Sequence, residues 1–77
     1  MWNTVSIEAL IKRINRRLKE TDEELKTTRG WHAKLQLGTY YIRNFARNWI
    51  VNHDVDPETV GRELGVLRSW EKVLEED

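Results

Sequence analysis

The chain of 77 residues contains 13 basic and 13 acidic side chains, four tryptophans and no cysteine. A chain of this length supports one small domain with a thin core, and the lack of cysteine excludes disulfides and cysteine-ligated zinc. We therefore predict a single α+β domain over residues 1–77. No stretch approaches the ~18 apolar residues of a membrane span, so we expect a cytoplasmic protein without membrane contact.

The net charge of zero conceals a split along the chain. Residues 1–53 hold ten basic and five acidic side chains, whereas residues 54–77 hold three basic and eight acidic ones. Either the two ends attract each other and close the domain, or they form two surfaces with different partners. We favour the first interpretation.

The first predicted element is an amphipathic helix that begins after Ser6 and ends near Glu20. Serine is a good N-cap residue, and apolar residues recur behind it at helical spacing. The opposite side of the helix is basic and carries Lys12, Arg13, Arg16, Arg17 and Lys19. We expect the apolar side to pack on a sheet and the basic side to face outward.

Residues 21–29 allow two interpretations. Leu25 continues the helical spacing, so the helix could run on to Gly30 as a C-cap and form a coiled-coil dimer. Against this, an acidic patch over residues 20–24 lies at the negative end of the helix dipole, and β-branched residues follow it. We favour a short strand near residues 24–29, and we predict that residues 30–37 are a connection.

The clearest strand signal lies in residues 38–53, which we predict to form a central antiparallel hairpin. Aromatic and β-branched residues lie on both sides of a turn marked by Asn44 and Asn48. With a loop over residues 44–47, the core face of the hairpin consists of Tyr40, Ile42, Trp49 and Val51, with Ile42 facing Trp49 and Tyr40 facing Val51. The predicted fold is an N-terminal helix on a sheet of two or three strands.

A C-terminal pair of helices is predicted to close this domain. Asp56 is a strong N-cap candidate, Pro57 fits the first helical position, and Gly65 fits a C-cap. A last helix from Leu67 to Glu76 would then turn Trp70 inward.

Residues 59–66 and the segment after them resemble a helix-turn-helix unit. Gly61 occupies the small position of the first helix and Gly65 occupies the turn. The resemblance implies that the second helix enters a nucleic-acid groove. Glu71 stands where the family has an apolar packing residue, and the second helix is net acidic, which does not suit a groove lined by phosphates. We therefore interpret the unit as an ordinary helical pair.

Catalysis has one candidate constellation, because His53 is followed by Asp54 and Asp56. An imidazole beside two carboxylates can bind a metal or act in acid–base chemistry. A turn and a helix cap account fully for the two aspartates, and no phosphate-binding or metal-binding motif occurs. We predict that the protein is not an enzyme and uses no cofactor or metal.

Two binding functions remain. The five basic residues of the first helix could contact nucleic-acid phosphates, with Tyr41 and Trp49 stacking on bases. The favoured function is a protein–protein interaction module, a small regulator or inhibitor of a larger protein, present as a monomer or homodimer. Its expected partner-binding residues are Trp31, Tyr41, Phe45, Arg43 and Arg47, because aromatic and arginine side chains dominate binding hot spots. We expect Trp49 and Trp70 to lie in the core.

Overall fold

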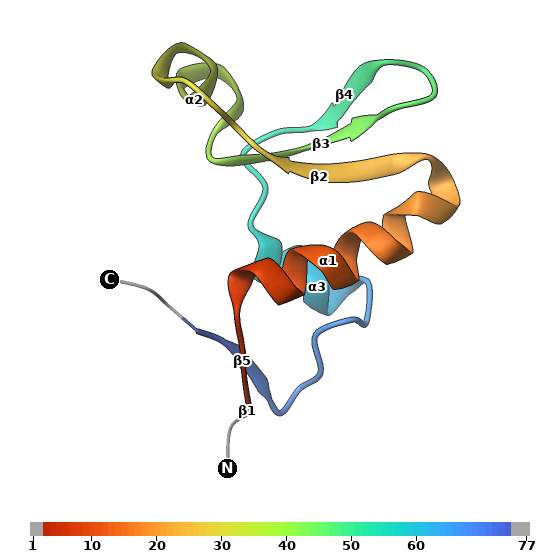
Figure 1. Ribbon diagram of the computed structural model, residues 1–77, viewed down its shortest axis with the longest axis vertical. Coiled ribbons are helices and arrows are strands. Elements are labelled where there is room, and N and C mark those ends of the chain that lie inside the picture. Colours follow the sequence, from red (N-terminus) through yellow and green to blue (C-terminus); the bar gives the residue numbers. More distant parts are fainter. Residues whose placement is uncertain (1–2, 75–77) are drawn as a thin grey trace.

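The computed structural model (Figure 1) describes residues 3–74, which form an α+β fold of three α-helices, a three-stranded antiparallel sheet and a parallel strand pair. The elements in chain order are β1 (Asn3–Val5), α1 (Ile7–Leu18), a 3-10 turn (Lys19–Thr21), β2 (Glu23–Thr27), α2 (Trp31–Leu37), β3 (Tyr40–Asn44), β4 (Trp49–Asn52), α3 (Pro57–Glu63) and β5 (Glu71–Val73).

Helix α1 begins where the sequence predicts, because Ser6 Oγ accepts a hydrogen bond from the Ala9 N–H at 3.1 Å. After Leu18 the helix tightens into the 3-10 turn, and Asp22 then adopts a left-handed φ of 60° that ends it. The chain reverses into β2, which pairs antiparallel with β3. The third strand is therefore confirmed, and a continuous helix to Gly30 is excluded.

The three-stranded sheet has the order β2-β3-β4, and α1 lies along β2 and α3 (Figure 1). One side chain of α1 fixes this position. Asn15 Oδ1 accepts from the Leu25 N–H at 2.6 Å, and Asn15 Nδ2 donates to the Leu25 carbonyl at 3.1 Å. The helix thus satisfies both outward backbone groups of Leu25 at the edge of β2.

The register of the hairpin differs from the prediction. Trp49 lies opposite Asn44 rather than opposite Ile42, and Ile42 lies opposite Asn52 after an irregularity in the ladder. The turn chemistry explains the shift. Asn44 Oδ1 accepts from the Arg47 N–H at 2.8 Å, and Asn48 takes the left-handed φ of 58° that closes the loop over residues 45–48. The loop therefore begins one residue later than predicted.

Residues 30–37 are not a plain connection, because Trp31–Leu37 form helix α2. Glycines with positive φ lie at both ends, Gly30 at 84° and Gly38 at 76°. A Cβ on Gly38 would overlap the Asp54 side chain, so only glycine allows the chain to pass there. Between these two breaks, Ala, Lys, Leu and Gln favour helix.

The C-terminal segment differs in part from the prediction. Asp56 caps α3, and Gly65 takes a positive φ after it, as predicted. The predicted last helix is instead strand β5, which pairs parallel with β1 so that Val73 lies beside Val5. Glu71 starts this strand, and its carboxylate accepts from the Arg68 N–H, which favours a turn at this point. The second half of the resemblance to a helix-turn-helix is therefore absent, and residues 75 and 76 of the predicted helix lie outside the described part.

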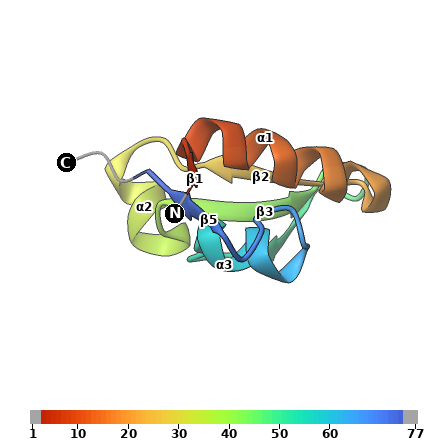
Figure 2. The same ribbon diagram turned by 90° about the horizontal axis from the view of Figure 1, so that it is seen from below.

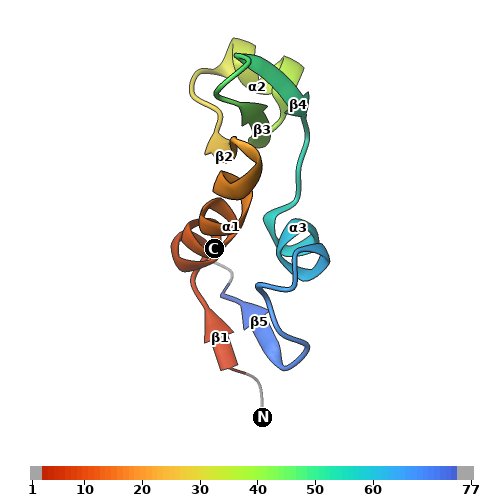
Figure 3. The same cartoon turned by 90° about the vertical axis from the view of Figure 1, so that its right-hand side faces the viewer.

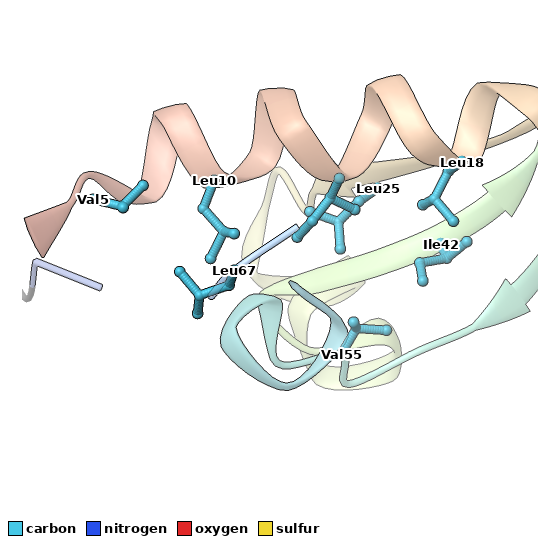
Figure 4. Packing of buried hydrophobic residues seen from close by; sticks show 8 residues of the cluster. Val5, Leu10, Leu18, Leu25, Ile42, Val55 and Leu67 are labelled. Atoms are coloured by element: carbon cyan, nitrogen blue, oxygen red, sulfur yellow. The ribbon is translucent and has the colours of Figure 1, made fainter. Parts of the chain in front are cut away.

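The core is a single row of aliphatic side chains between α1, the sheet and α3 (Figure 4). It consists of Val5, Leu10, Ile14, Leu18, Leu25, Ile42, Val55 and Leu67. Trp49 and Trp70 are not part of it, since 53% and 51% of their surfaces are exposed. The prediction that these rings fill the core is wrong.

The shape of the molecule explains why large rings stay outside. The described chain measures 40 × 31 × 15 Å, and Figure 3 shows the sheet and α2 at one end, the strand pair at the other, and α1 between them. Seen from below, α1 and α3 lie on opposite sides of β3 (Figure 2). A thickness of 15 Å leaves room for little more than one layer of side chains between helix and strand, because packed layers lie about 10 Å apart. Aliphatic residues fill this layer, and the bulky aromatics lie at its margins.

Candidate functional site

The five predicted partner-binding residues lie at two separate places. Trp31 is on α2 and 67% exposed, whereas Phe45 and Arg47 are on the exposed loop at the opposite end of the hairpin (Figure 1). Tyr41 and Arg43 are half-buried on β3 between these ends. The fold therefore does not gather all five into one site. Trp31 and Tyr41 share one end, and Phe45 belongs to another surface.

Tyr41 borders a hollow of ≈ 430 Å³ between α2 and the sheet. Lys26 and Arg29 line this hollow, with Ala33 and Leu37 of α2 forming its apolar wall; no carboxylate lines it among the described residues. The opening therefore combines apolar surface with positive charge. Trp31 and Leu35 do not line the hollow, and at about 100° per residue they lie on the side of α2 opposite Ala33 and Leu37. We call Trp31 and Leu35 the α2 surface.

Helix α2 exposes a second apolar side chain, which the sequence analysis missed. Leu35 is 76% exposed, and it lies four residues after Trp31, so both project from the same side of the helix. No residue of α2 is buried. The i, i+4 spacing of Trp31 and Leu35 was the available signal, but we interpreted this segment as a connection.

The arginines of the hairpin are engaged by neighbouring side chains. Arg43 Nε lies 3.0 Å from Glu24 Oε1, in an ion pair whose geometry is not that of a hydrogen bond. The Arg47 guanidinium lies over the Trp49 ring at 5.2 Å, within the range of a cation–π contact. Trp49 and Val51 of β4, which we predicted on the core face of the hairpin, are exposed, and Ile50 between them is exposed as well. No pattern in the sequence tells which strand lies at the edge of a sheet.

The basic residues of α1 are exposed as predicted, but one of them has a structural partner. Arg13 Nη1 donates to both Glu71 oxygens at 3.0 Å and to the Val66 carbonyl at 3.2 Å. The Arg68 backbone N–H and the Arg13 guanidinium together hold the pKa of Glu71 below its usual value. Arg13 therefore ties α1 to β5. The remaining basic side chains of this face are Lys12, Arg16, Arg17 and Lys19.

The histidine–aspartate constellation forms a turn. His53 Nδ1 lies 3.0 Å from Asp54 Oδ2 in an exposed contact, Asp54 has a left-handed φ of 52°, and Asp56 caps α3. Within residues 3–74, no three His, Cys, Asp or Glu side chains are grouped as metal ligands. In the same part of the chain, no helix has the length and apolar character needed to cross a membrane.

Comparison with known proteins adds no relative. No protein-family model, no curated protein and no solved structure matches this chain. The function is therefore argued from the surface of the molecule itself.

Proposed function

We propose that this protein is a non-enzymatic protein–protein interaction module, a small regulator or inhibitor that binds a larger protein through the α2 surface. The observation that carries this proposal is the pair of exposed side chains on α2, Trp31 and Leu35, in a helix that buries none of its residues. Neither side chain belongs to the hydrophobic core of the described residues, and the Trp31 ring lies against His32, with ring centroids 3.6 Å apart. An unexplained apolar patch of this kind is typical of a binding surface.

The free energy gained by covering the exposed part of Trp31 is large enough for a binding hot spot. A buried tryptophan ring removes roughly 150–250 Å² from water, at roughly 25 cal/mol per Å². Since about two thirds of Trp31 is exposed, covering it would contribute about 3–4 kcal/mol. This is the size of contribution that a few anchors make in protein interfaces.

Positive charge lies on the other side of α2, at the hollow, and indicates the kind of partner. Lys26 and Arg29 border the hollow beside Tyr41, with no carboxylate among its described lining residues. A partner with an apolar groove for α2 and acidic residues at its rim fits this arrangement. Helix-in-groove recognition through residues at i and i+4 is a common mode of this kind.

The experiment compares baits that differ at one tryptophan. Tagged wild-type protein, Trp31→Ala and Trp70→Ala are used to recover partners from a lysate of the source organism, with nuclease present. Trp70 is a second exposed tryptophan, at 51% against 67% for Trp31, and it directly precedes β5 at the other end of the molecule (Figure 3), so it is the matched control. We expect a protein that binds wild type and Trp70→Ala and is lost with Trp31→Ala. A partner retained by Trp31→Ala and by Leu35→Ala would refute the α2 surface.

The nucleic-acid hypothesis makes a different prediction on a different surface. Binding through α1 would be lost on charge reversal at Arg16 and Arg17 and would weaken steeply with salt. Arg13 is left unchanged in this test because its loss would also break the contact with Glu71. Recovery of nucleic acid alone, sensitive to both changes, would replace the protein-binding proposal.

A further inference from the structure

The hollow beside α2 lies on the face of the sheet that points away from the core. Leu25 and its strand partner Ile42 are both buried in the core beneath α1. Because side chains alternate along a strand, Lys26 and its strand partner Tyr41 point to the opposite face. Both of them line the hollow of ≈ 430 Å³, and α2 supplies its apolar wall. Strand pairing and α2 therefore build the hollow together.

Thr28 gives the hollow a buried hydroxyl. Its N–H donates to the Thr39 carbonyl at 2.8 Å, so the ladder of β2 and β3 continues through Thr28 and keeps it on the same face as Lys26. Thr28 lines the hollow, and only 4% of its surface is exposed. Its Oγ1 has no hydrogen-bond partner among the described residues. Buried hydroxyls normally have a partner, so Thr28 has a donor left for a group bound in the hollow.

Two cations line the hollow, Lys26 and Arg29, and no carboxylate lines it among the described residues. Arg29 is exposed and takes part in no ion pair within residues 3–74. Lys26 Nζ lies 4.0 Å from Glu24 Oε1, at the outer limit of an ion pair, whereas Arg43 Nε holds the same oxygen at 3.0 Å. Both lining cations are therefore available to an anion.

The hollow has room for more than an inorganic anion. A phosphate group fills only a few times the ~30 Å³ of a water molecule. The volume of ≈ 430 Å³ lies within the range of small-molecule pockets, about 300–1,000 Å³. Ala33 and Leu37 form apolar surface beside the cations, and Tyr41 adds an aromatic ring. A ligand that fits this hollow has an anionic group and a small apolar part.

We propose that the hollow binds a phosphate monoester that carries a small apolar or aromatic group. The phosphate lies between Lys26 and Arg29, and the Thr28 hydroxyl donates to one of its oxygens. Two cations suit the dianion that a monoester carries at neutral pH, and arginine presents a planar fork of donors that matches phosphate oxygens. The apolar group of the ligand packs against Ala33 and Leu37.

This site goes beyond the proposed function, because its ligand is a small molecule and because Trp31 and Leu35 lie on the other side of α2. The two proposals share only the charge of Lys26 and Arg29. Trp31→Ala should lose the protein partner and keep the phosphate monoester. Failure of one proposal is therefore distinguishable from failure of the other.

NMR titration of the ¹⁵N-labelled full chain tests the class of ligand. Phenyl phosphate is the probe, and its matched controls are inorganic phosphate, which lacks the ring, and phenyl sulfate, which has one negative charge less. We expect phenyl phosphate to shift the amide signals around Thr28, Arg29 and Ala33 with a Kd below about 1 mM. Each control should bind at least about tenfold more weakly.

Three results of this titration would overturn the inference. Inorganic phosphate that binds as tightly as phenyl phosphate would exclude the apolar contact. Phenyl sulfate that binds equally well would exclude selection of a dianion. Signals that shift only on the basic face of α1 would show anion binding at another surface.

A phosphate group can also belong to a nucleic acid, whose internal phosphodiesters carry one negative charge each. A single-stranded oligonucleotide without a terminal phosphate should leave phenyl phosphate bound in the hollow. Displacement of phenyl phosphate by this oligonucleotide would assign the hollow to nucleic acid and refute a small-molecule ligand.

Matched variants test the residues of the site. Arg29→Gln should weaken phenyl phosphate binding at least about tenfold, because it removes a charge that lines the hollow. Arg17→Gln removes the same charge from the exposed face of α1 and should leave the Kd unchanged. Thr28→Val keeps the shape of the side chain and should weaken binding about three- to tenfold through the lost hydroxyl.

The fold of each variant is checked by its NMR spectrum. If the buried Thr28→Val substitution unfolds the chain, the exposed Arg29 decides the outcome through its own variant. Unchanged binding in Arg29→Gln, or an equal loss in Arg17→Gln, would overturn the proposed site.

Discussion

The side chain of Asn15 is expected to be one of the most consequential polar groups in this protein. It joins α1 to the sheet through two hydrogen bonds to Leu25, at 2.6 Å from the N–H and 3.1 Å to the carbonyl. Leu25 itself is buried, with 2% of its surface exposed. Asn15→Ala removes both bonds and leaves two backbone groups without partners at the covered edge of β2. We expect a large loss of stability.

The magnitude follows from the two bonds. Each hydrogen bond contributes about 0.5–1.5 kcal/mol, and an unsatisfied buried donor or acceptor costs about 1–3 kcal/mol. Alanine is a better helix former than asparagine by up to about 0.7 kcal/mol, which offsets part of the loss. The net change in the free energy of unfolding is therefore about 1–5 kcal/mol, with about 3 kcal/mol at the centre of this range. A chain of this length has about 4–12 kcal/mol in total.

Denaturant unfolding of Asn15→Ala and of a matched control measures this change. Asn52→Ala is the control, because Asn52 is exposed and its side chain accepts only from the neighbouring His53 N–H. We expect the control to change the free energy of unfolding by less than about 0.5 kcal/mol. The Tm of Asn15→Ala should fall by about 10–20 °C, since 1 kcal/mol corresponds to about 4–8 °C in a small domain.

Two results would refute this reasoning. If Asn15→Ala and Asn52→Ala lose the same small amount of stability, the contact between Asn15 and Leu25 does not hold α1 on the sheet. In the second result, Asn15→Ala is destabilised while the exchange rate of the Leu25 N–H rises only as much as the loss of global stability requires. In that case the loss arises elsewhere in α1.

Three further predictions concern other contacts. Gly38→Ala should lower the free energy of unfolding by at least about 1 kcal/mol, measured in urea, because the residue has a φ of 76° and its new Cβ would overlap Asp54. Glu71 has a lowered pKa in the folded state, so the stability it contributes is present above its unfolded pKa and is lost as pH falls through the folded value. Urea midpoints between neutral pH and about pH 3 should therefore fall more steeply for wild type than for Glu71→Gln; equal slopes would exclude Glu71 as a source of this dependence. Trp31→Ala should leave the free energy of unfolding within about 0.5 kcal/mol of wild type, by thermal or urea unfolding, and a larger loss would mean that the ring is structural.

Local chemistry in the sequence determined the starts and ends of several elements. The hydroxyl of Ser6 and the carboxylate of Asp56 each bond to amides within three residues, so their helices begin as predicted. Gly65 has the expected positive φ, and the change from helix to strand before Leu25 was also predictable. All of these features depend on contacts between residues that are close in sequence, which is why propensity and spacing describe them.

The error in the C-terminal segment occurred where contacts between distant residues decide the structure. Residues 71–73 become a strand because β1 lies beside them and because Arg13, 58 residues away in the sequence, binds Glu71. No local pattern encodes this strand. The hairpin error has a local cause instead, because the hydrogen bond from the Arg47 N–H to Asn44 Oδ1 shifts the loop by one residue and places Trp49 opposite Asn44 rather than Ile42.

For the candidate sites, too, some features follow from the sequence and others only from the tertiary structure. The sequence determined that aromatic and basic residues are abundant, and two of the aromatic side chains chosen for partner binding, Trp31 and Phe45, are exposed. Only the tertiary structure decided that these two are at opposite ends, that Arg13 has a structural partner, and that β4 rather than β2 is the open edge. The physical reason is that exposure and edge position depend on which elements pack together. In a molecule 15 Å thick, few large side chains find cover on both sides.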